Sequence, residues 1–149
     1  FKSKDELFTE LVDRFVMRVM AVVHRVEPGP GHIALKQIKD NINRVVDLLF
    51  NHRELTILVL REAVGVDEKV ESKLQTMYGY LHSMVTGALE NGASMGIIRP
   101  VNTSVAAPAL IGAIKEVLYQ LVVVQNPKDA DRDEVADVLF QLTLRGLQP

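Results

Sequence analysis

The sequence predicts an all-α fold, a bundle of about six helices in which the last two form a four-helix bundle with a second copy of the chain. The first observation is that apolar residues recur at spacings of three and four along most of the chain, which is the period of an amphipathic helix. The second is that capping residues and Gly–Pro breaks separate these periodic segments. The third is that the last two segments are apolar around most of their circumference, as helices are when they are buried on two sides.

The composition fits one domain with a sizeable core. The chain has 149 residues, 48% of them apolar, and no uninterrupted apolar run reaches the roughly 18 residues of a membrane span. No cysteine is present, which excludes disulfides, thiolate metal sites and cysteine nucleophiles. The net charge of −2 is unlike the basic surface that binds DNA phosphates. No signal peptide is visible, so we expect a cytoplasmic chain that by itself contacts neither DNA nor a membrane.

The first helix is expected to begin at Ser3 and to end before Glu27. Ser3 and Glu6 have the spacing of a capping box, in which the side chain of each accepts the backbone N–H of the other. Apolar residues then follow at helical spacing, as far as the prolines and glycines of residues 28–31. That run of breakers excludes a continuous helix.

Three helices are expected in the middle of the chain, at about residues 32–50, 53–64 and 68–91. Gly65 is expected to end the second of them, and Asp67 to cap the third. Gly92 and then Gly96 are expected to end that third helix, with residues 97–100 as a connector.

Two further helices are expected at about residues 102–125 and 131–145. Asn102 or Ser104 is expected to cap the first, and Asp131 with Glu134 to cap the second, which Gly146 ends. The first of these helices has one side of small residues and another of large ones. Because small residues let two helix axes approach, we assign the small side to the partner copy and the large side to the chain's own core.

The assignments on these two helices are as follows. The expected interface residues are Ala106, Ala109, Ala113 and Val117 on the first helix, and Leu139 and Leu142 on the second. The expected core residues on the first helix are Ile111, Ile114, Leu118 and Val122. The two apolar sides of the last helix cannot be told apart from the sequence.

The start of the chain resembles a known family. Residues 1–8, Phe-Lys-Ser-Lys-Asp-Glu-Leu-Phe, resemble the junction between the DNA-binding domain and the fourth helix of TetR-family transcriptional regulators, and residues 92–100 resemble the exit from that family's seventh helix. The resemblance implies that residues 1–149 are the C-terminal regulatory domain, which binds ligand and dimerises, and that the N-terminal helix-turn-helix domain is absent. It also implies a small-molecule effector that alters affinity for operator DNA, most often in a repressor, and a homodimer held by the last two helices.

The residues form no recognisable catalytic or metal-binding motif. None of the four histidines stands three residues after a glutamate, as a helical di-metal site requires, and HExxH and GxSxG are both absent. We therefore expect no enzyme activity and no metal or cofactor. The histidines are expected at the surface or in caps. Arg61 and Arg99 can pair with an acidic ligand, but a solvated or capping role is preferred.

Methionines mark the expected ligand site. They lie on the two long helices that the resemblance places around a cavity, and methionine suits irregular apolar pockets. The expected ligand-binding residues are Met17, Met20, Leu74, Met77, Tyr78, Leu81, His82 and Met84. The other interpretation of these methionines is ordinary core.

Two functions from different classes remain open. One is the sensing of an apolar small molecule by a TetR-like regulator. The other is a ligand-free helical dimerisation or scaffold module. A contiguous cavity of roughly 300 Å³ or more between the N-terminal helices favours sensing, and a fully packed core favours the scaffold.

Overall fold

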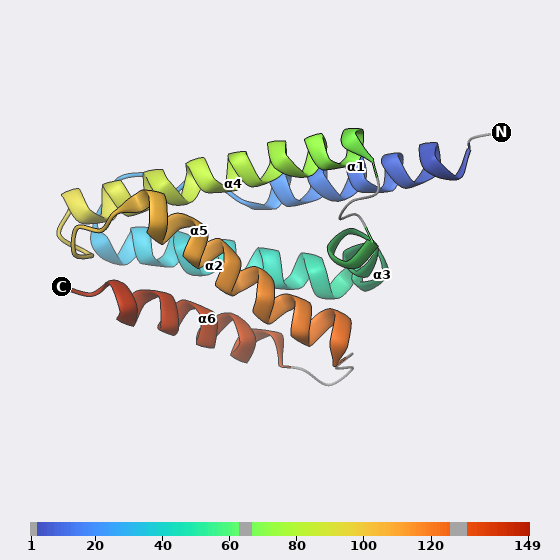
Figure 1. Cartoon of the computed structure of the whole chain (residues 1–149). Helices are drawn as coiled ribbons and strands as arrows, with labels where there is room; N and C mark the ends of the chain where they lie inside the picture. The colour runs from blue at the N-terminus through green and yellow to red at the C-terminus, as the bar shows by residue number, and fades with distance from the viewer. Residues whose placement is uncertain (1–2, 63–66, 126–130) are drawn as a thin grey trace.

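The computed structural model describes residues 3–62, 67–125 and 131–149, and these residues fold almost entirely into helices. The α-helices in these ranges (Figure 1) are α1 (Lys4–Val22), α2 (Gly31–Asn51), α3 (Arg53–Ile57), α4 (Glu68–Ser94), α5 (Thr103–Leu118) and α6 (Arg132–Leu147). Two π-helical turns, η1 (Leu58–Glu62) and η2 (Tyr119–Val124), continue α3 and α5. The described residues contain no strand, so the prediction of an all-α bundle of about six helices is confirmed.

Capping side chains begin α1, α4, α5 and α6, whereas no side chain caps the starts of α2 and α3. Ser3 donates its backbone N–H to the Glu6 carboxylate at 3.1 Å, and Glu6 donates its N–H to the Ser3 hydroxyl at 3.2 Å. The side chains of Asp67, Asn102 and Asp131 cap α4, α5 and α6. Each cap satisfies backbone N–H groups that have no partner within the helix. The expected stop at residue 65 lies outside the described residues.

α1 ends at Val22, earlier than the expected end before Glu27. The reason lies on α2, whose side chains bind the backbone that leaves α1. The Asn41 side chain accepts the His24 N–H at 2.8 Å and donates to the His24 carbonyl at 2.6 Å. Arg44 donates to the Val22 carbonyl at 2.8 Å. These bonds satisfy polar groups that another helical turn would otherwise have to pair, and so stabilise an extended exit.

The expected glycine stops of α4 and α6 are partly wrong. Gly92 lies within α4, where a Cβ atom would approach Ile98 to 3.3 Å, so its role is close packing. Gly96 has a φ of 70° and makes the left-handed turn that leads away from the helix. Gly146 lies within α6, which runs on to Leu147.

Arg99 caps the end of α6. Its backbone N–H donates to the Leu147 carbonyl at 2.9 Å, and its guanidinium donates to the Gly146 carbonyl at 3.2 Å. The last carbonyls of α6 therefore have partners from the connector before α5, which explains why the helix continues through a glycine. The preferred capping role of Arg99 is confirmed.

The helices pair across the chain. α1 lies along α4, α2 along α6, and α5 crosses between α4 and α6 (Figure 1). One core cluster joins all the long helices, and a smaller one lies where α4, the connector after it and α5 meet. Fully buried members of the larger cluster include Val12 of α1, Val46 of α2, Val70 of α4 and Leu118 of α5. Every long helix therefore contributes to one continuous core.

Candidate functional site

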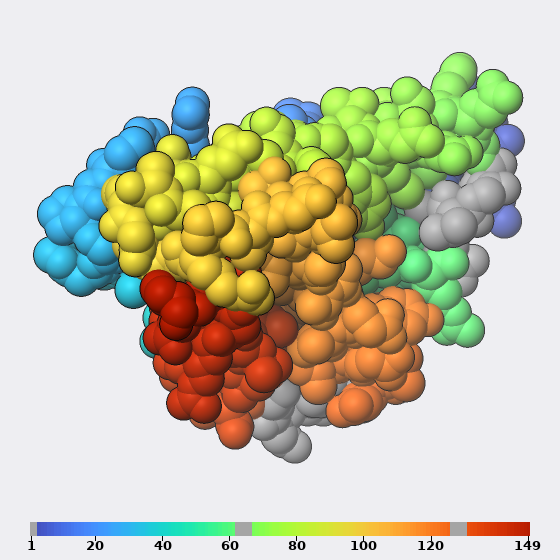
Figure 2. All heavy atoms as spheres, turned by 60° about the vertical axis from the view of Figure 1, so that its left-hand side comes forward, coloured from blue at the N-terminus to red at the C-terminus, as the bar shows by residue number. Residues whose placement is uncertain are grey.

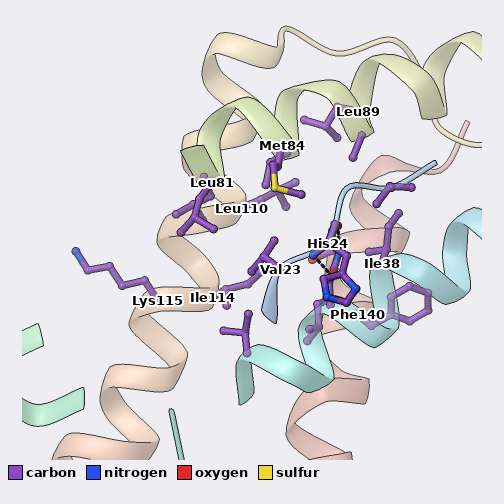
Figure 3. A pocket seen from close by; sticks show the side chains of 18 of the residues that line it. Val23, His24, Ile38, Leu81, Met84, Leu89, Leu110, Ile114, Lys115 and Phe140 are labelled. Carbon is purple, nitrogen blue, oxygen red and sulfur yellow. Dashed lines mark hydrogen bonds between the residues drawn. The ribbon is translucent and has the colours of Figure 1, made fainter. Parts of the chain in front are cut away.

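A cavity of about 250 Å³ lies inside the bundle, between α1, α2, α4, α5 and α6 (Figure 3). Leu81 and Met84 project from α4 toward Ile114 of α5 and toward Val23, which follows α1. His24, Ile38 and Phe140 lie at the other side of the same space. The lining is almost wholly aliphatic, methionine and phenylalanine side chains. Such a wall holds an apolar molecule by removing its surface from water.

The α4 wall follows from helical spacing. Met77, Leu81, Met84 and Ala88 stand three and four residues apart and all line the cavity, because such residues share one face of a helix. The opposite wall includes the extended residues after α1, whose backbone Asn41 holds in place. The early end of α1 therefore shapes the cavity.

The structure divides the predicted ligand residues into two groups. The residues that line the cavity are Met77, Tyr78, Leu81 and Met84. The residues that do not line it are Met17, Met20, Leu74 and His82. Ligand binding by the first group stays a prediction.

The residues of the second group lie elsewhere. The side chain of Met17 is 71% exposed, on the outer face of α1. Met20 and Leu74 pack against the main core cluster instead. His82 is half-buried on α4 but is not among the residues that line the cavity, although it stands one helical turn after Tyr78.

The structure also adds residues that the sequence did not assign to the site. Ile38 and Ile42 of α2, and Phe140 and Leu144 of α6, line the cavity. Ile114, expected in the core, lines it as well. The apolar stripe of α2 is visible in the sequence, but the same stripe predicts a filled core equally well, so no sequence signal separates the two.

Two polar side chains, Tyr78 and Lys115, meet at the edge of the cavity. The Lys115 ammonium lies 5.6 Å from the centroid of the Tyr78 ring, within the range of a cation–π contact. Burial raises the pKa of the Tyr78 phenol, so this hydroxyl stays protonated at neutral pH and can donate a hydrogen bond. None of the described residues lining the cavity has a carboxylate, so the local charge there is positive.

The part of the chain that the structure describes contains no candidate metal-binding site. No group of three histidine, aspartate or glutamate side chains there is close enough to hold a metal ion. The imidazole of His52 contacts Arg18 at 2.7 Å from Nδ1, which is a surface role of the kind expected for the histidines.

A second candidate surface lies on α5 and α6, which are neighbours on one face of the molecule (Figure 2). Val105 of α5 is 63% exposed and Leu142 of α6 is 67% exposed. Ala109 and Ala113 are exposed beside them, whereas Ala106 and Val117 are half-buried. We call Val105, Ala109, Ala113, Val138 and Leu142 the outer apolar face.

The assignment of Leu139 to an interface needs correction. Its side chain is 4% exposed and belongs to the chain's own core, because α6 packs this side against α2. Leu142 points outward instead, so the structure identifies which side of α6 is open. The assignment of Leu118 and Val122 to the core is confirmed.

The helix from Thr103 to Val124 is long and apolar enough to cross a membrane by length and composition. Only 17% of its most apolar 18-residue segment is buried. The sequence alone indicated no segment of this kind, because polar residues such as Gln120 interrupt the apolar run. The mean hydropathy of the segment is nevertheless high. A helix of this composition at a protein surface indicates an interaction site.

No protein-family model and no curated protein matches the sequence. Solved structures match it along its whole length. A TetR-family transcriptional regulator from Streptomyces coelicolor A3 has a TM-score of 0.74 at 20% identity, with 100% of this chain and 73% of that chain covered. A TetR transcription regulator from Haloarcula marismortui has a TM-score of 0.74 at 16% identity, with 99% and 78% covered. The transcriptional regulator FadR from Bacillus subtilis, in complex with stearoyl-CoA, has a TM-score of 0.71 at 20% identity, with 99% and 78% covered. The chain therefore has the fold of TetR-family regulators.

Proposed function

We propose that this chain, with its TetR-like fold, is the ligand-sensing and dimerisation domain of a transcriptional regulator, most simply a repressor. The observation that carries the proposal is the apolar cavity at the centre of the bundle. A core whose only task is to hold helices together is packed to high density. A pocket of about 250 Å³ bordered by five helices lacks that packing, and a bound molecule can fill it.

The size of the cavity bears on the choice between sensor and scaffold. Its volume of about 250 Å³ lies just below the roughly 300–1,000 Å³ of most small-molecule sites. It is nevertheless far larger than the space one water needs. We therefore favour sensing of a small ligand over a ligand-free scaffold, which stays the second candidate.

The comparison with FadR supports a ligand with an apolar chain. That protein, which has the same fold, is bound to stearoyl-CoA. The cavity lining here is similarly suited to hydrocarbon, because it consists almost wholly of apolar side chains.

The proposed partner at the outer apolar face is a second copy of the chain. Val105 and Leu142 are large, apolar and mostly exposed, and the small residues Ala109 and Ala113 leave room for another helix axis. A two-fold arrangement buries α5 and α6 of one copy against α5 and α6 of the other, as in a four-helix bundle. This also accounts for an apolar helix at the surface without a membrane.

The proposed signal passes through α1. The cavity wall includes Phe15 and Val19 of α1, and Val23 beyond its end. The family resemblance places a DNA-binding domain before this helix. A ligand that binds better to one orientation of α1 shifts the population toward it, and so changes the spacing of two recognition helices on DNA.

The test uses a cavity-filling variant of the 149-residue chain. Met84→Trp places a larger side chain in the void and should abolish the rise in melting temperature that an apolar ligand produces by mass action. The matched control is Ser83→Trp, on the exposed side of the same helix turn, which should keep the full ligand response.

The stability of the variant without ligand separates the two candidate functions. If the void is real, Met84→Trp costs little, whereas overpacking a filled core costs about 1–3 kcal/mol. A loss of that size in denaturant unfolding, with no ligand response in the parent chain, excludes the sensor and leaves the scaffold.

A further inference from the structure

The polar edge of the cavity narrows the class of ligand, an inference that rests on the proposed sensor function. Lys115 and Tyr78 line the cavity from two different helices, α5 and α4, and they touch each other there. In Figure 3, Lys115 lies at the outer edge of the lining, and its ammonium points away from the labelled apolar side chains that surround the cavity. We call Lys115 and Tyr78, the polar edge of an otherwise largely apolar lining, the mouth.

Apart from the cation–π contact within it, this pair has no hydrogen bond and no ion pair among the described residues. The Tyr78 hydroxyl has no hydrogen-bond partner among the described residues, and neither has the Lys115 ammonium, whose one recorded contact there is with the Tyr78 ring. The described carboxylates lie outside the cavity lining. A cation and a phenol donor side by side complement an anion, since both stabilise negative charge.

The volume sets a lower limit on the apolar part that the site can hold. At about 30 Å³ for each water-sized group, a cavity of about 250 Å³ has room for at least about eight such groups. A side-chain wall of this kind favours hydrocarbon and disfavours any polar atom that finds no partner. A charged group must therefore remain at the mouth, where solvent and Lys115 both reach it.

We propose that the ligand is an anionic amphiphile, with a hydrocarbon body of about eight or more heavy atoms in the cavity and its acidic group beside Lys115 and Tyr78. The shared chemistry is an acyl chain that ends in negative charge. A free carboxylate and the phosphates of an acyl thioester are two possible sources of that charge, and the experiment separates them.

The experiment measures binding of matched eight-carbon probes to the 149-residue chain by titration calorimetry. The probes are octanoate, octanoyl-CoA, 1-octanol and octylammonium. We expect octanoate or octanoyl-CoA to bind more tightly than octanol by up to about fivefold, because an exposed charge pair contributes at most about that factor. Octylammonium should bind most weakly. The preference for the anionic probes over octanol should decrease as the salt concentration is raised.

Two variants and a control assign the preference to the mouth. Lys115→Met should remove the preference for the anionic probes over octanol, and Tyr78→Phe should reduce that preference. Lys69→Met removes an exposed lysine of α4 outside the cavity lining. It should change neither the preference for the anionic probes nor the affinity for octanol. Lys115 is exposed, so its replacement should leave the melting temperature of the free chain unaltered.

The other outcomes are distinguishable. If octanol binds as tightly as octanoate and octanoyl-CoA, the anionic class is wrong while the sensor function stands. If the preference survives Lys115→Met, the acidic group lies elsewhere and the assigned mouth is wrong. If none of the four probes binds, the ligand class is wrong, and the Met84→Trp test decides whether the sensor function falls with it.

Discussion

Asn41 is the residue on which the shape of the site most depends. Its amide bonds both the N–H and the carbonyl of His24 and also accepts a bond from Arg44 at 2.6 Å. One side chain therefore fixes the extended backbone after α1 against α2. That segment is both the end of the proposed signalling helix and part of the cavity wall.

Replacing Asn41 with alanine should destabilise the chain by about 1–2 kcal/mol, because two backbone groups of His24 lose their partners. Asn43→Ala is the matched control, since its side chain is also half-buried on α2, and it should stay within about 0.5 kcal/mol of the parent. Urea unfolding followed by circular dichroism measures both. Equal losses of unfolding free energy in the two variants would contradict this role of the Asn41 side chain.

Residue chemistry was enough to predict part of the site. Met77 and Met84 lie on the apolar stripe of α4, and the stripe is a property of the sequence. The prediction that Met17 lines the site was wrong because the sequence does not show which face of a long helix other helices cover. The face that holds Met17 is exposed. Core and cavity lining share one apolar pattern, so only the positions of the other helices distinguish them.

At the scale of elements, α5 and α6 together leave a group of apolar side chains uncovered. Leu142 and Val138 of α6 and Val105 of α5 are large apolar side chains that are more than half exposed. On a chain of this size such a concentration of apolar surface marks a binding face. The proposed occupant, a second copy, predicts how single charges act there.

Leu142→Glu should convert a dimer into a monomer, because association would bury an unpaired carboxylate. Leu142 is exposed in the single chain, so the variant should still fold and keep its helical circular dichroism signal. Light scattering at micromolar concentration measures the mass of both forms. Ser83→Glu, an equal change of charge on the exposed side of α4, should remain dimeric. A parent chain that is monomeric at every concentration contradicts the proposed partner.

Helix starts were predictable and helix ends were not. Ser3, Asp67 and Asn102 act through side chains within three residues of the backbone groups they cap, so local sequence contains the whole signal. The end of α1 depends on Arg44 and the end of α6 on Arg99, which lie far away in the sequence. Such ends require the tertiary structure.

At the scale of the whole molecule, the charge balance separates sensing from DNA binding. The net charge of −2 gives no electrostatic attraction to a polyanion. The chain alone should therefore not retard duplex DNA in a gel at physiological salt. Attaching a helix-turn-helix domain before α1 should restore binding to a palindromic site. Tight, salt-sensitive binding by the 149-residue chain alone would contradict this division of roles.

The cavity also has a mechanical consequence, because an apolar space that water fills poorly makes the folded chain occupy more volume than its atoms require. Hydrostatic pressure favours whichever state has the smaller volume, and unfolding reduces the volume of most proteins by about 20–100 mL/mol, an amount that scales with internal voids. The cavity of about 250 Å³ should therefore make the unfolding volume change of this chain larger than that of Met84→Trp. High-pressure nuclear magnetic resonance should show that the parent chain unfolds at a lower pressure than Met84→Trp. A ligand that fills the cavity should raise the midpoint pressure of the parent chain but not that of Met84→Trp.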